Sequence, residues 1–160
     1  MFKIGDYVIY GLTGVCTVVD IKPSEITKED CYILTCNDSK HMTICIPVTS
    51  DKVRAPISSS EALSHIKSLP SLNGVWYDRM ALESEVCKTL KGHDVSMHFA
   101  LLKGFHEKRI ERNNMGKDLT TRENRIFNQV KHFIFTELSV ALNISVEEIE
   151  DFIQKNIKEV

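Results

Sequence analysis

Residues 1–21 read MFKIGDYVIYGLTGVCTVVDI, and this stretch decides the fold of the N-terminal part of the chain. Its segments 6–10 and 15–21 are rich in valine, isoleucine and tyrosine, which are enriched in β-strands. Gly11 and Gly14 stand between the segments, and glycine suits the sharp corners that short strands need. The stretch therefore predicts two short strands joined by a tight turn.

Two further segments of the same character follow at 31–36 and 41–47. The short polar loop from Asn37 to Lys40 separates them and favours a hairpin. Four or five short strands in the first 55 residues are too few for a large sandwich. The expected fold of this part is a small, strongly bent sheet or barrel of the Tudor or SH3 type.

The hydrophobic pattern becomes helical after Pro56. Ser58 and Glu61 have the spacing of a capping box at the start of a short helix that ends near Leu69. Helical spacing and further capping residues predict later helices at 75–91, about 95–113, about 121–142 and from about 146 onward.

The sequence thus predicts an α+β protein with two domains, the β module at 1–56 and an all-helical bundle of four to five helices at 57–160. No apolar run approaches the ~18 residues of a membrane span. The first residues lack the apolar core of a signal peptide. The five cysteines are odd in number and include no CxxC pair, which favours reduced thiols in a cytoplasmic protein.

Four residues of the β module have a spacing that calls for a test against zinc chemistry. Cys31, Cys36, His41 and Cys45 form C-x4-C-x4-H-x3-C, which resembles a zinc knuckle without matching one. Cys31 and Cys36 are five residues apart, so they face opposite sides of one strand. Because cysteine is often a small core residue, the pattern favours packing over a metal site.

Residue patterns that would indicate a catalytic site are also only weakly represented in the sequence. Cys87 and His93 are the residue types of a nucleophile and its base, but Cys87 lies on or beside the apolar arc of its predicted helix. The chain contains no glycine-rich phosphate loop, no GxSxG and no HExxH. The expectation is a protein that is not an enzyme and that needs neither a metal nor a cofactor.

Charge is distributed unevenly along the helical part. Residues 100–132 contain eight basic and four acidic residues, whereas 133–160 contain two and six. Within the helix of the basic region, the only attractive pair at i,i+4 is Lys103 with Glu107. Most of the positive charge therefore lacks a partner on its own helix, which favours a phosphate-binding face over a solvated helix surface.

Trp76 is the only tryptophan, and it follows the turn-forming sequence PSLNG at 70–74. On a helical wheel it shares an arc with Val75 and Val86, which favours packing in the core. The alternative places it in the first turn of a helix, where an aromatic wedge can stack on bases or separate them.

The opening residues resemble the CarD/CdnL family of bacterial RNA-polymerase-binding regulators, whose start reads roughly F-x-x-G-D-x-V-x-Y-x-x-x-G-V-x-x-V. The resemblance continues through 44–62 and returns at 101–145, so it extends over nearly the whole chain. The residues that match the opening pattern are Phe2, Gly5, Asp6, Val8, Tyr10, Gly14, Val15 and Val18, and those of the second segment are Pro47, Val53, Arg54 and Ile57.

The resemblance implies a Tudor-like module that docks on the RNA polymerase β subunit by strand pairing at a sheet edge. It also implies a helical module that contacts promoter DNA near the upstream edge of the melted region and stabilises the open complex. Some family members insert a tryptophan into the minor groove there.

The predicted function is therefore that of a monomeric, non-enzymatic transcription regulator that contacts the DNA backbone and minor groove without sequence specificity. The alternative is a protein-only interaction module that binds polymerase or another partner without touching DNA. The residues expected to bind polymerase are Met42, Thr43, Ile44, Cys45, Ile46 and Pro47. Those expected to contact DNA are Trp76, Arg79, Lys88, Lys103, Lys108, Arg109, Arg112, Arg122 and Arg125.

Overall fold

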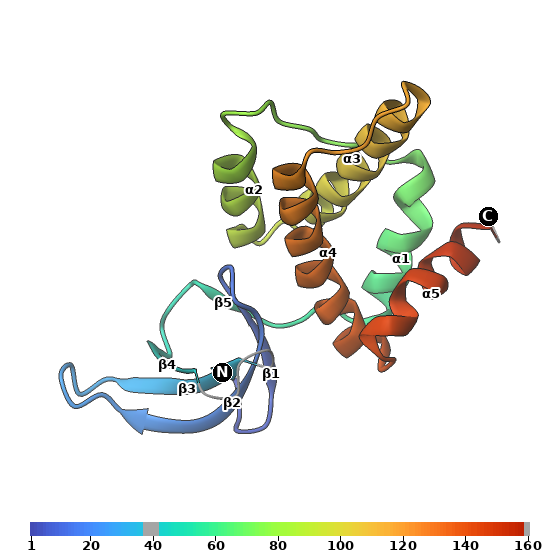
Figure 1. The fold of residues 1–160 in the computed structure, drawn as a ribbon. Coiled ribbons are helices and arrows are strands. Elements are labelled where there is room, and N and C mark those ends of the chain that lie inside the picture. Colours follow the sequence, from blue (N-terminus) through green and yellow to red (C-terminus); the bar gives the residue numbers. More distant parts are fainter. Residues whose placement is uncertain (37–41, 159–160) are drawn as a thin grey trace. The chain divides into compact units, whose positions relative to one another are not determined.

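The computed structural model describes residues 1–36 and 42–158, and the chain divides into two compact units, Met1–Pro56 and Ile57–Val160 (Figure 1). The first unit is an antiparallel β-sheet and the second consists of helices. This order confirms the predicted α+β class, with a small Tudor-like β module followed by a helical part. No helix in the described ranges is long and apolar enough to cross a membrane.

The β unit is a single five-stranded sheet with the order β4-β3-β2-β1-β5. Gly11 and Gly14 have φ angles of 46° and 79°, and they form the turn between the first two strands. The loop Asn37 to Lys40 and His41 lie outside the described residues. The strands are β1 Tyr7–Tyr10, β2 Gly14–Pro23, β3 Asp30–Cys36, β4 Thr43–Pro47 and β5 Val53–Arg54.

Strand alternation places the core of this unit on one face of the sheet. Val8, Val18 and Leu34 are fully buried there, and Phe2 packs its ring edge against Tyr32 at 5.7 Å between centroids. A register shift between Val18 and Asp20 indicates a β-bulge in the longest strand, and bulges increase local twist and bending. The bent sheet that the sequence predicts is therefore the one observed.

Capping residues define most helix ends in the second unit. Ser58 and Glu61 form the expected capping box, Thr120 caps the fourth helix by accepting from the Glu123 amide, and Gly92 follows the end of the second helix. Figure 1 shows the helices in sequence colours. They are α1 Ser59–Ser68, the 3-10 turn η1 Leu69–Ser71, α2 Leu82–Lys91, α3 Val95–Asn114, α4 Thr121–Leu142 and α5 Val146–Lys158.

The prediction of a helix over 75–91 is wrong in its first part, because α2 begins only at Leu82. Residues 73–78 instead form a non-helical segment whose Val75 amide donates to the Ala100 carbonyl of α3 at 2.9 Å. Gly104 allows this close approach, since a Cβ there would lie 1.8 Å from the Val75 oxygen. The tertiary contact with α3 overrides the helical pattern of the sequence.

Candidate functional site

The β4 edge consists of the strand Thr43–Pro47 and the preceding residue Met42. β4 is the last strand on its side of the sheet in the described residues, and it pairs only with β3. Ile46 is buried in the core, whereas Thr43, Cys45 and Pro47 are exposed and Met42 is 51% exposed. All the residues expected to bind polymerase therefore lie together on one sheet edge.

Backbone hydrogen bonding determines which groups of β4 face outward. The Val48 amide donates to the Asp30 carbonyl of β3 at 3.0 Å. Amides alternate in direction along a strand, so Ile44 and Ile46 also point toward β3. The N–H and C=O groups of Thr43 and Cys45 then point away from the sheet. These outward groups can accept another strand.

The exposed Cys45 of the β4 edge lies close to the buried Cys31 of β3. Cys45 is opposite Ile33 in the register, which makes it the diagonal neighbour of the buried Cys31. Burial raises the pKa of the Cys31 thiol, and the Cys45 thiol beside it raises that pKa further. Cys31 is therefore protonated at neutral pH and acts as a packing residue.

The other cysteines and histidines that the structure describes do not converge with this pair. Cys36 lies on the core face opposite Cys16 of β2, as its odd spacing from Cys31 predicts. Within the described ranges no three metal-binding side chains cluster, and His41 lies outside them. In the helical unit, Cys87 is half-buried and His93 is exposed.

Trp76 lies in the non-helical segment 73–78 before α2 and not on a helix, which corrects the helical-wheel placement. The indole is half-buried and packs edge-on against Phe105 of α3, with ring centroids 5.0 Å apart. The Lys108 ammonium lies 5.7 Å from the centre of the same ring, within the range of a cation–π contact. One part of the tryptophan thus anchors the segment to α3 while another remains accessible.

Arg109 and Arg112 of α3 have acidic or polar partners in the helical unit. Arg112 makes two hydrogen bonds of 2.8 and 2.7 Å to the carboxylate of Glu123, whose side chain is 8% exposed. Arg109 donates to Asn124 at 2.6 Å, lies 3.6 Å from Asp118, and stacks 4.8 Å above the Phe127 ring. Both guanidinium groups therefore join α3 to the start of α4.

Lys103 and Lys108 are also engaged. The Lys103 ammonium donates to the carbonyls of Leu69 and Pro70 at 2.5 and 3.2 Å. Lys108 pairs with Glu111 one turn away at 3.4 Å. Four of the basic residues expected to contact DNA thus take part in contacts that support the fold.

Glu83 of α2 binds two arginines of α4. Arg122 and Arg125 reach its carboxylate at 3.1 and 3.4 Å, and their side chains are 49% and 52% exposed. Hydrogen bonds from Arg122 and then Arg125 lower the pKa of Glu83, so this carboxylate is ionised throughout the neutral range. Arg122 also donates to the Arg79 carbonyl at 3.2 Å, which ties the turn before α2 to α4.

Arg79 and Lys88 have exposed side chains, and the described residues provide no ion pair for either. Met80, beside Arg79, is 96% exposed at the start of the turn that leads into α2. We define the cationic surface as Arg79, Arg122 and Arg125, which are joined by the Arg122 contacts with the Arg79 carbonyl and Glu83 and by the Arg125 contact with Glu83, while Lys88 lies about 140° around α2 from Glu83. Within the expected set, these residues and Lys88 hold the basic groups that are most accessible.

Glu83 and Met80 adjoin this surface, and the sequence patterns did not indicate either residue as part of a site. Glu83 lies 39 residues from Arg122 in the chain, so helical i,i+4 spacing does not reveal the pair. Met80 fell within a predicted helix, where a methionine is expected to pack. The turn sequence before Leu82 is the only local signal that could have suggested its exposure.

Comparison with known proteins supports a function for the first unit. Residues 2–66 match the family model of the CarD-like/TRCF RID domain, a domain that interacts with RNA polymerase. The match includes the whole β unit and most of α1. No curated protein matches the chain significantly. The N-terminal part of the chain, residues 2–66, is therefore a domain of the CarD-like/TRCF RID family.

Proposed function

We propose that this protein is a non-enzymatic transcription regulator that docks on the RNA polymerase β subunit through the β4 edge. The observation that carries the proposal is the outer side of β4, which pairs with no other strand among the described residues, in a domain of the polymerase-interacting type. A polymerase strand would pair with the outward amide and carbonyl groups of Thr43 and Cys45. Strand pairing uses backbone groups, so it tolerates the varied side chains of Met42 to Pro47.

The helical unit would contact promoter DNA and stabilise the open complex. Support comes from the cationic surface, where two half-exposed arginines share one carboxylate, and from Arg79 and Lys88, which have no ion pair among the described residues. Phosphate contacts position a protein without reading sequence. Binding to polymerase would therefore locate the protein at promoters. A bias of about 1.4 kcal/mol toward the open complex would change the population of that complex tenfold.

Apolar groups near this surface suit a minor-groove contact. Met80 is 96% exposed and adjoins Arg79, and Trp76 keeps part of its indole accessible. Proteins that bind the minor groove combine cations with apolar wedges, including methionine. We assign the minor-groove contact to Met80 and Trp76. Trp76 also holds the segment 73–78 on α3.

The docking strand can be tested with two substitutions at one position. Cys45→Pro removes the outward amide, while Cys45→Ser keeps it and removes only the thiol. Proline is tolerated where an edge amide faces solvent, so the free protein should keep its fold. The loss of one hydrogen bond and the added ring should weaken binding to core polymerase about tenfold or more, whereas the serine variant should bind like the wild type.

A pull-down or fluorescence titration with core polymerase measures both variants, and circular dichroism confirms their folding. Equal binding of the proline and wild-type proteins would refute docking by β4. The protein-only alternative is favoured by the engagement of Lys103, Lys108, Arg109 and Arg112 within the fold. It predicts that Arg79→Glu with Lys88→Glu leaves the open-complex lifetime unchanged, whereas DNA contact predicts a shorter one.

A further inference from the structure

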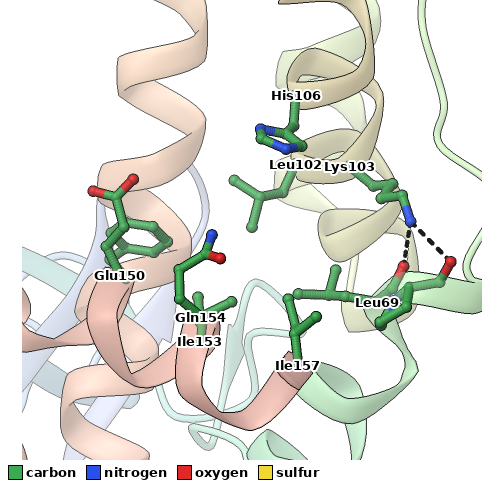
Figure 2. A pocket seen from close by; sticks show the side chains of 10 residues that line it. Leu69, Leu102, Lys103, His106, Glu150, Ile153, Gln154 and Ile157 are labelled. Atoms are coloured by element: carbon green, nitrogen blue, oxygen red, sulfur yellow. Dashed lines mark hydrogen bonds between the residues drawn. The ribbon is translucent and has the colours of Figure 1, made fainter. Parts of the chain in front are cut away.

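A hollow of about 280 Å³ lies inside the helical unit, where η1, α3, α4 and α5 converge (Figure 2). Its inner wall is apolar, and Leu69, Leu102 and Ile153 there are 6%, 8% and 7% exposed. Phe135 and Ile157 complete the wall. The volume is roughly twice that of an engineered 150 Å³ cavity that binds benzene, so it has room for one or two apolar side chains.

The mouth of the hollow is polar and open. Figure 2 shows His106 of α3 on one side and Glu150 and Gln154 of α5 on the other. The nearby Lys103 ammonium is turned to the carbonyls of Leu69 and Pro70. Within the described part of the chain, no hydrogen bond or ion pair involves the exposed Glu150 carboxylate.

Helix α5, which carries Glu150, also has acidic residues outside the mouth of the hollow. Glu147, Glu148 and Asp151 are exposed on α5, whereas Lys155 is its one exposed base among the described side chains. Negative charge at an apolar opening disfavours nucleic acid and attracts a cation. The arrangement therefore combines an apolar recess with one exposed carboxylate, Glu150, at its mouth, while Lys103, the one lysine or arginine of the lining, is held by backbone carbonyls.

We propose that this hollow is a docking site for a partner-protein segment that inserts an aliphatic or aromatic side chain and places a lysine or arginine against Glu150. The volume lies below the 300–1,000 Å³ range of typical small-molecule sites, and an anchoring side chain in a pocket is a common feature of protein interfaces. The site is separate from both the β4 edge and the cationic surface, and it does not depend on the proposed function.

A fluorescent 18-residue peptide of leucine and lysine in amphipathic helical order is a suitable probe, titrated against the full chain by polarisation. Glu150→Lys should weaken its binding at least tenfold. Asp151→Lys is the matched control, because it makes the same charge change one residue away, about 100° around the helix and outside the hollow. It should change the dissociation constant less than threefold.

The apolar part has its own tests. Gln154→Trp, which fills the mouth from an exposed position, should abolish binding, and a peptide with serine in place of leucine should bind at least tenfold more weakly. Methyl signals of Leu102, Ile153 and Ile157 should shift on titration. The proposal is overturned if the probe does not bind, if Asp151→Lys weakens it as much as Glu150→Lys, or if benzylamine saturates these methyl shifts while the peptide does not bind.

Discussion

Gly104 is the residue that determines where Trp76 lies. It is buried in the middle of α3, and its missing side chain lets Val75 and Gly74 cross directly over the helix backbone. The Val75 amide completes the contact by donating to Ala100. The indole then packs on Phe105, one residue further along α3.

Gly104→Ala should therefore destabilise the helical unit, although alanine favours helices more than glycine does. The new Cβ would lie 1.8 Å from a backbone oxygen, so the segment 73–78 must move. We expect a loss of about 3 kcal/mol in unfolding free energy, measured by urea denaturation. Ser96→Ala, at an exposed position of the same helix, should remain within about 0.5 kcal/mol. An unchanged stability for Gly104→Ala would contradict the close crossing.

The stability of the folded protein should depend on pH through Glu83. Hydrogen bonds from Arg122 and Arg125 lower its pKa in the folded protein. A lowered folded pKa means that the stabilisation is complete above the unfolded value, near pH 4, and is lost as pH falls through the folded value. Carbon-13 NMR titration of Glu83 should give a midpoint below the ordinary glutamate value of about 4.3. In the double variant Arg122→Ala/Arg125→Ala, the titration midpoint of Glu83 should be higher than in the wild type. Equal midpoints in the two proteins would refute the pairing of Glu83 with these arginines.

At the scale of elements, α3 and α4 are joined by a clamp, which we define as Arg109 and Arg112 with Asn124 and Glu123. Glu123 is also the residue whose amide the Thr120 side chain caps. The clamp therefore holds both the side chains and the start of α4. We interpret the clamp as a structural feature, although its arginines have the residue type that binds phosphate.

Arg112→Met tests this interpretation. It leaves the nearly buried Glu123 carboxylate without its bidentate partner, which should cost about 2–3 kcal/mol, reduced from the full buried-pair value because Arg112 is 21% exposed. Adding Glu123→Met should restore part of the stability, as measured by thermal and urea unfolding. A phosphate-binding role for Arg112 would instead leave stability unchanged and weaken contact with DNA.

The sequence predicts the strands and helices better than it predicts the tertiary contacts between them. Strand alternation, the glycine turn and the capping residues Ser58 and Thr120 are local signals, so the sheet and most helix starts could be read directly. The start of α2 could not, because a contact 25 residues away in sequence sets it. The same limit applies to Arg112 and Arg122, whose counterions Glu123 and Glu83 lie on a different helix and are absent from any i,i+4 comparison.

At the scale of the whole molecule, the proposed function assigns a separate task to each of the two units. The β4 edge lies in Met1–Pro56 and the cationic surface lies in Ile57–Val160. A variant in one unit should therefore alter one step of the proposed function and leave the other intact. This separation distinguishes recruitment by polymerase from stabilisation of melted DNA.

Arg122→Ala with Arg125→Ala is the variant that tests the second step. If both arginines leave Glu83 to contact phosphates, their loss should shorten the open-complex lifetime and reduce the slope of log lifetime against log salt by about two. Lifetimes at several potassium chloride concentrations measure this slope, and binding to core polymerase should match the wild type. Lys67→Ala with Lys155→Ala removes the same charge from exposed sites outside the surface and should leave the slope unchanged. An identical slope for both double variants would assign the helical unit to protein contacts, because only phosphate contacts release counterions in proportion to their number.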